Sequence, residues 1–103
     1  MAEVRAYSLL RELVRDCGAT LVEEKVVGKD SSHLHAEYEG AAKVRFRLCW
    51  DRREKRGVIQ VRGPDKEWQD SGPEVRKTKS VPYTNLHAFM AHAEALAGRR
   101  APM

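Results

Sequence analysis

The sequence predicts an α+β fold with an N-terminal helix, an antiparallel meander of three or four strands and a C-terminal helix, both helices lying on one sheet face. Near both ends of the chain, apolar residues recur every three or four positions, as they do in amphipathic helices. In the middle, short runs alternate polar and apolar residues and are separated by turn residues, which is typical of strands with one solvated face. The chain has 103 residues, so we expect a single domain over residues 1–103.

The two helices have recognisable ends. The first is predicted between Glu3 and Cys17, and Gly18 follows it as the usual residue just past a helix C-terminus. Thr84 or Asn85 is expected to cap the second helix, and Gly98 to close it. The predicted core positions of the second helix are Leu86, Phe89, Met90, Ala93, Leu96 and Ala97. Residues 99–103 are expected to form a frayed tail.

Four strand segments follow from alternation and β-branched content. Residues 20–27 predict the first strand, and residues 28–31 a turn. Residues 33–39 and 43–50 alternate polar and apolar side chains and predict a hairpin around residues 40–42. Residues 51–57 indicate a charged loop, and residues 58–62 the next strand.

Residues 63–82 are polar and interrupted by two Gly-Pro pairs, which predicts a long connection of a kind that is often functional. An alternative is a basic edge strand over residues 74–81, with Val75, Lys77, Lys79 and Val81 on one side. Trp68 lies within this polar segment, and no strand or helix periodicity accounts for a large apolar side chain at that position. It either folds back to cap the core or is an exposed contact for a partner.

Alternation also assigns the two faces of the sheet. The inward set is Leu34, Ala36, Tyr38, Val44, Phe46, Leu48, Trp50, Ile59 and Val61. The outward set is His33, His35, Glu37, Glu39, Lys43, Arg45, Arg47, Cys49, Val58, Gln60 and Arg62. Pairing Glu39 near Lys43 would place Glu37 opposite Arg45 and His35 opposite Arg47, so that some charges compensate each other.

Basic residues are concentrated in the middle of the chain. Residues 1–42 hold five bases and eight acids, whereas residues 43–79 hold twelve bases and six acids, a net charge of +6. Such a segment is typical of proteins that bind polyanions, although a solvated face has the same composition. Apolar runs are only a few residues long and the N-terminus does not resemble a signal peptide, so we expect a soluble protein of a bacterial or phage-infected cytoplasm.

The leading functional hypothesis is therefore nucleic-acid binding through phosphate contacts. The candidate residues are Arg45, Arg47, Arg52, Arg53, Lys55, Arg56 and Arg62. Since Tyr38, Phe46 and Trp50 point inward, no aromatic side chain alternates with these bases, and duplex or structured RNA is favoured over single strands. The alternative is a protein-interaction module, such as a phage or prophage accessory inhibitor, that uses Trp68 and residues 63–82. Homodimerisation through an exposed sheet edge is a further alternative.

Few residues indicate catalysis or a cofactor. Cys17 and Cys49 lie far apart and have no histidine at metal-ligand spacing, so we expect reduced thiols and no metal. His33 and His35 share a strand face, and a histidine there can transfer protons near neutral pH. Metal binding by the pair would need a third ligand, and none stands at a recognisable spacing. His87 and His92 do not share a helix face. We expect no cofactor, and binding rather than catalysis.

One resemblance points to an activity. The order of a helix, the run 17–22 (Cys-Gly-Ala-Thr-Leu-Val), a turn, Ser32-His33 at a strand start and Val81-Pro82 before a closing helix resembles the HicA-type toxins. These small RNA-cleaving proteins have a fold like that of double-stranded-RNA-binding domains. The resemblance implies a single catalytic histidine at His33. The family's glycine before Ser-His is Ser31 here, and Leu34 stands where the family has a second histidine.

Overall fold

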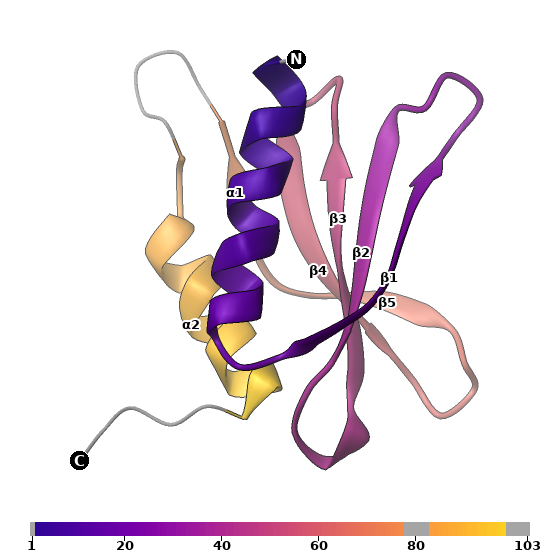
Figure 1. Ribbon diagram of the computed structural model, residues 1–103, viewed down its shortest axis with the longest axis vertical. Coiled ribbons are helices and arrows are strands. Elements are labelled where there is room, and N and C mark those ends of the chain that lie inside the picture. The colour runs from indigo at the N-terminus through magenta and orange to yellow at the C-terminus, as the bar shows by residue number, and fades with distance from the viewer. Residues whose placement is uncertain (1, 78–82, 99–103) are drawn as a thin grey trace.

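The computed structural model describes residues 2–77 and 83–98 and shows two helices and five strands in the predicted α+β order (Figure 1). The elements, in chain order, are α1 (Ala2–Asp16), β1 (Thr20–Val27), β2 (His33–Glu39), the 3₁₀ turn η1 (Ala41–Lys43), β3 (Arg45–Asp51), β4 (Arg56–Arg62), β5 (Trp68–Arg76) and α2 (Leu86–Ala97). All neighbouring strands are antiparallel, and the sheet order is β1-β2-β3-β4-β5.

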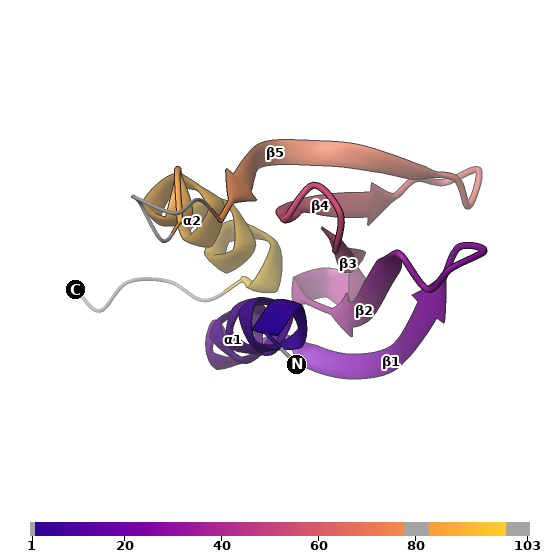
Figure 2. The same ribbon diagram turned by 90° about the horizontal axis from the view of Figure 1, so that it is seen from above.

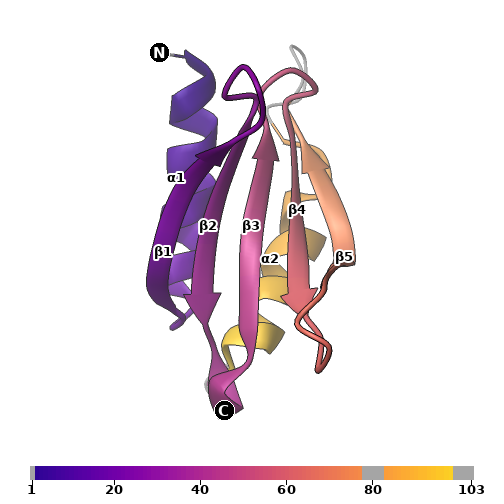
Figure 3. The ribbon, with the colours of Figure 1, turned by 90° about the vertical axis from the view of Figure 1, so that its right-hand side faces the viewer.

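Both helices cover the same face of the sheet, as predicted. Viewed from above, both helices lie on one side of the curved sheet, α1 beside β1 and β2 and α2 beside β5 (Figure 2). The opposite face carries no helix, and all five strands are seen uncovered from that side (Figure 3). The fold therefore has two layers, with one sheet face available to solvent.

The core lies between the helices and the inward side chains of the strands. Every second residue of β2 and β3 is buried, because successive side chains of a strand point to opposite faces. Tyr38 and Phe46 stack there with ring centroids 5.5 Å apart, and the Tyr38 hydroxyl donates a hydrogen bond to the Arg11 carbonyl of α1 (2.9 Å). The largest fully buried side chains are Trp50, Tyr38, Phe46, Phe89, Leu10, Leu48, Ile59, Val14 and Val75.

The sheet has five strands rather than the predicted three or four, because residues 68–76 form β5 rather than part of a long connection. The strand was missed because it lies at the sheet edge, where only Val75 is fully buried and the alternation is weak. An irregularity in pairing between Gly57 and Ile59 of β4 also shifts its register, beside Gly72 (φ 77°) and Pro73. The alternative edge strand over residues 74–81 overlaps β5 only in part, and residues 78–82 lie outside the described residues.

The predicted hairpin forms, but its register was wrong by two residues. Glu39 lies opposite Arg45 and Glu37 opposite Arg47, while His35 lies opposite Cys49. The reason is a longer turn: Gly40 and Val44 close it through a 2.8 Å hydrogen bond from the Gly40 amide to the Val44 carbonyl. Lys43 belongs to this turn, with a left-handed φ of 61°, and not to the open face of the strand.

Two further boundaries differ slightly from expectation. The charged loop between β3 and β4 is a tight turn of residues 52–55, since Asp51 and Arg56 already belong to the strands. Asn85 precedes α2 with a left-handed φ of 59°, and its side chain makes no capping hydrogen bond. Gly98 closes α2 as predicted, in the left-handed conformation that suits glycine. The tail 99–103 lies outside the described residues.

Candidate nucleic-acid interface

The helix-free face of the sheet, here called the open face, has no net charge of either sign. It carries six acidic and six basic side chains: Glu23, Glu37, Glu39, Asp51, Asp70 and Glu74, and Lys25, Arg45, Arg47, Arg56, Arg62 and Arg76. Since the strands are in register, these side chains form rows across the sheet, in which opposite charges can pair. The surplus of bases in the middle of the sequence therefore does not produce a uniformly basic face.

One part of the open face combines arginine with an aromatic ring. The Arg47 guanidinium lies over the Trp68 ring, with its Cζ 4.3 Å from the ring centroid. Its Nε donates a hydrogen bond to Gln60 Oε1 (2.8 Å), and the Gln60 amide donates to Asp70 Oδ1 (2.8 Å). Arg62 lies directly opposite Trp68 in the β4–β5 register. We call Arg47, Arg62 and Trp68 the Arg-Trp cluster.

The position of Trp68 corrects the sequence interpretation. The ring does not cap the core; it is half-buried on the open face, at the start of an edge strand. Its location was missed because β5 itself was missed, although β5 pairing places Trp68 on the same face as Arg62. The expectation that no aromatic side chain accompanies the outward bases was wrong. The preference for duplex or structured RNA over single-stranded nucleic acid rested on that expectation, so it no longer holds. Gln60 and Asp70, which orient Arg47, were not identified as site residues.

The other predicted bases are mostly paired with carboxylates. Arg45 makes ion pairs with Glu37 (2.6 Å) and Glu39 (3.4 Å), and Arg56 with Glu74 (3.3 Å). Arg53 pairs with Asp30, and Arg52 donates a hydrogen bond to the Ser31 carbonyl (3.0 Å). In contrast, Arg47, Lys55 and Arg62 have no carboxylate partner within residues 2–77 and 83–98. Lys55 lies in the β3–β4 turn and Arg62 at the far end of β4, so the seven predicted bases do not form one site.

A hollow of about 170 Å³ lies beside the Arg-Trp cluster on the open face. It is lined by His33, His35, Arg47, Cys49, Asp51, Arg56, Val58 and Gln60. Burial raises the pKa of the Cys49 thiol to about 11, so the thiol is protonated at neutral pH and its Sγ donates to Gln60 Oε1 (3.2 Å). Burial, with the charges of Arg47, His33 and Lys25, lowers the pKa of His35 to about 4. The lining therefore combines two arginines with the Asp51 carboxylate, and its His35 imidazole is neutral at pH 7.

The neutral state of His35 makes stability depend on pH. Its pKa is about 4 in the folded protein against 6.5 for an ordinary histidine, so between these values the unfolded chain binds more protons than the folded chain. The free energy of unfolding should therefore fall as the pH is lowered from 6.5 to 4. His35→Gln should make this fall shallower, as measured by urea titrations across that range. A slope in the variant as steep as that of the wild type would contradict the assignment.

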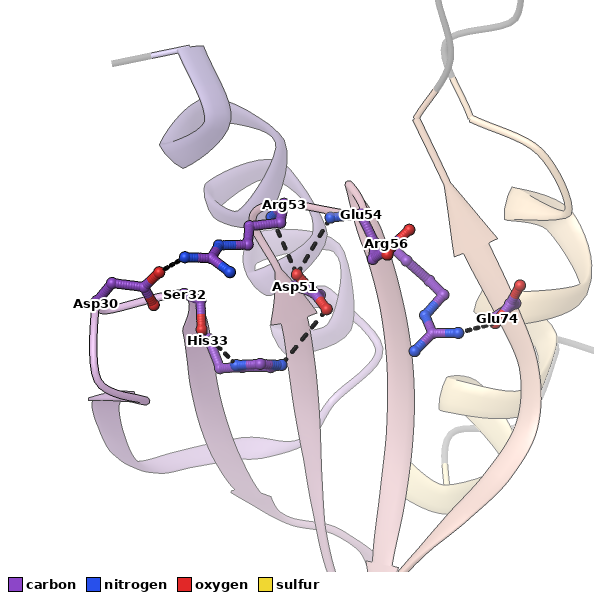
Figure 4. Close-up of polar contacts among 8 residues, drawn as sticks. All are labelled: Asp30, Ser32, His33, Asp51, Arg53, Glu54, Arg56 and Glu74. Carbon is purple, nitrogen blue, oxygen red and sulfur yellow. Dashed lines mark hydrogen bonds and ion pairs between the residues drawn. The ribbon is translucent and has the colours of Figure 1, made fainter.

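His33 lies between a hydroxyl and a carboxylate at the end of the sheet where two turns meet (Figure 4). Its Nδ1 is 2.9 Å from Ser32 Oγ, and its Nε2 is 3.5 Å from Asp51 Oδ2. Asp51 Oδ1 also accepts hydrogen bonds from the amides of Arg53 (3.0 Å) and Glu54 (3.2 Å). His33 and Asp51 thus connect the β1–β2 turn to the β3–β4 turn. These contacts give His33 a structural role. Catalysis by His33 stays a prediction that rests on the toxin resemblance.

Comparisons with known proteins add no family to this picture. No protein-family model matches the chain, and neither curated proteins nor solved structures yield a match. Among the described residues, no three His, Cys, Asp or Glu side chains are grouped so that they could hold a metal ion. Neither described helix has the length and apolar character needed to cross a membrane.

Proposed function

We propose that the chain binds single-stranded nucleic acid on the open face, with a base stacked at the Arg-Trp cluster and flanking phosphates held by Arg47 and Arg62. The observation that carries the proposal is the guanidinium of Arg47 stacked on the half-buried Trp68 ring, with Arg62 opposite it. An indole and a guanidinium plane are both surfaces on which bases stack, and stacking tolerates any base sequence.

The hydrogen bonds around Arg47 support a preorganised site. Gln60 accepts a hydrogen bond from Arg47 Nε and is itself held by Asp70, while the Trp68 ring lies against the face of the guanidinium. Fixing a long side chain in advance lowers the entropy lost when a ligand binds. Arg47 has no carboxylate partner in the described part of the chain, so its charge is available to a phosphate.

The pairing of the other bases limits the electrostatic part of the affinity. A base that already pairs with a carboxylate neutralises little additional phosphate charge, so Arg45, Arg53 and Arg56 should contribute weakly. With two phosphates neutralised by Arg47 and Arg62, the logarithm of the binding constant should fall with the logarithm of salt concentration with a slope of about −1.4 for a single strand. Such a shallow slope distinguishes this site from one that uses all seven predicted bases.

Fluorescence anisotropy with labelled RNA and DNA, single-stranded and duplex, at several salt concentrations tests the proposal. Trp68→Ala should weaken single-strand binding about tenfold or more, because base stacking is lost, whereas Trp68→Phe should retain most of it. Arg62→Ala should reduce the salt slope by about 0.7. The matched control is Arg15→Ala, at an exposed arginine on α1, which should change neither quantity.

Two results would contradict the proposal. If none of the four nucleic acids binds, the open face is not a nucleic-acid site, and Trp68 would be examined instead as the anchor of a protein interface. If the duplexes bind and Arg52→Glu with Arg53→Glu abolishes binding while Trp68→Ala does not, the β3–β4 turn is the binding surface. In that case phosphate contacts without base stacking explain the affinity.

A further inference from the structure

The outer edge of β1 is an exposed strand edge. The sheet ends at β1, and no segment within residues 2–77 or 83–98 pairs with its outer side (Figure 3). Seven of its eight residues are exposed, Leu21 being the exception. Among the exposed residues are Val22, Val26 and Val27, and the Val26 side chain is 57% exposed. An edge of this length with unpaired backbone groups is a template for pairing with another strand.

The opposite edge of the sheet is protected. α2 packs on β5, and the His92 Nε2 lies 2.8 Å from Ser71 Oγ. Pro73 has no amide to donate, and the Thr84 amide donates to the Arg76 carbonyl (2.8 Å) at the end of the strand. Of the two edges, β1 is therefore the one on which a further strand can add.

The residues of β1 are self-complementary when the strand is paired with a second copy of itself. We propose that two copies of this chain associate through an antiparallel β1–β1 pair whose two-fold axis passes through Glu24. This register places Glu23 of one copy opposite Lys25 of the other, twice by symmetry. It also places Val22 opposite Val26. The pairing irregularity of β1 between Leu21 and Glu23 turns Leu21 to the helix side of the sheet, whereas Val27 lies on the open face, so the regular pairing ends at Val22. Glu23 and Lys25 lie 4.0 Å apart within one chain, and in this register the same exposed charges also pair across the two strands.

The two Glu24 residues meet at the axis, and their carboxylates would repel each other if they faced each other. They do not, because each Glu24 side chain, although 37% exposed, is bonded to α1 of its own chain. Its Oε1 accepts hydrogen bonds from the Tyr7 hydroxyl (2.6 Å) and from Arg11 Nη1 (2.8 Å). The Arg11 guanidinium compensates the carboxylate charge within the chain. The axis is therefore free of the like-charge contact that the sequence alone would suggest.

This pairing joins the two sheets edge to edge and covers neither open face. The residues of the Arg-Trp cluster lie on β3, β4 and β5, away from the β1 edge. The association does not depend on the proposed function, and either can fail without the other. Sedimentation velocity over a concentration series measures the association, and hydrogen exchange of the β1 amides should show protection that increases with protein concentration.

Charge reversal tests the register. Glu23→Lys alone and Lys25→Glu alone should each weaken dimerisation about tenfold or more, because like charges then face each other at both symmetric positions. An equimolar mixture of the two single variants should form a heterodimer, since each lysine of one variant then meets a glutamate of the other. The double variant Glu23→Lys with Lys25→Glu should dimerise as the wild type does.

These exposed positions are not expected to affect folding, and circular dichroism of each variant checks this. Arg15→Glu, on the exposed surface of α1, is the matched control for a change of charge and should not alter association. A wild-type chain that stays monomeric at high concentration would overturn the proposal. So would a dimer that both single variants retain, or a mixture of the two that forms no heterodimer, because the contact would then not be β1 against β1 in this register.

Discussion

Gly40→Ala is expected to lower the free energy of unfolding by about 2–3 kcal/mol, because the added methyl group has no space. An alanine Cβ at this position would overlap the Leu96 carbonyl oxygen and would lie 3.1 Å from Phe46 Cε1. The first contact is with the backbone of α2, which cannot rotate away as a side chain can. The β2–β3 turn and the C-terminal part of α2 would therefore have to separate. Urea denaturation followed by circular dichroism measures the change.

Gly63→Ala provides the matched control for this substitution. Gly63 also lies in a turn between strands and also lacks a left-handed φ, so alanine meets no conformational penalty there. The nearest atom to its new Cβ is Asp65 Oδ1 at 3.0 Å, the far end of a side chain. We expect a loss below about 1 kcal/mol. Similar losses for the two variants would show that the close packing of Gly40 on α2 does not limit stability.

Leu10→Ala is expected to destabilise the protein by about 3 kcal/mol, since it removes a fully buried side chain and leaves a cavity between α1 and the sheet. Leu10 is 0% exposed, and a methyl group added at Gly57 would lie 3.4 Å from the Leu10 Cδ1, which shows that Leu10 reaches the β4 backbone. For a domain of this size such a loss corresponds to a decrease in Tm of roughly 12–24 °C. Differential scanning calorimetry measures it.

The neighbouring residue supplies the control. Leu9→Ala makes the same chemical change one position earlier on the same helix, and it alters helix propensity equally, but the Leu9 side chain is 44% exposed. The expected loss is below about 1 kcal/mol. If Leu9→Ala were as destabilising as Leu10→Ala, α1 would have to pack on the sheet through a different face.

The open face shows how a charged segment and a functional surface can differ. The segment of residues 43–79 has a large excess of bases, yet ion pairs with Glu37, Glu39 and Glu74 neutralise several of them on the sheet. What remains available is a small cluster whose chemistry is stacking together with charge. The proposed binding therefore depends on Trp68 as much as on the arginines.

The amino-acid sequence was sufficient for the helices, for β1 to β4 and for the inward and outward faces within those strands, because these depend on local periodicity; Lys43, which lies in the turn, is the exception. Alternation over residues 33–39, for example, assigns Tyr38 to the core and Glu37 to solvent whichever strand lies alongside. The register of the β2–β3 hairpin needed the structure, since it depends on where the turn closes between Gly40 and Val44.

Only the tertiary structure decided which outward residues form a site. β5 has little apolar alternation because an edge strand buries few side chains, so the sequence does not mark it as a strand. Once β5 pairs with β4, Trp68 lies opposite Arg62 and beneath Arg47, residues that are 6 and 21 positions away in sequence. Local patterns determine the direction in which a side chain points. Long-range strand pairing determines which side chains meet. Ion pairs with carboxylates determine which of the outward arginines keep a charge that is available to a ligand.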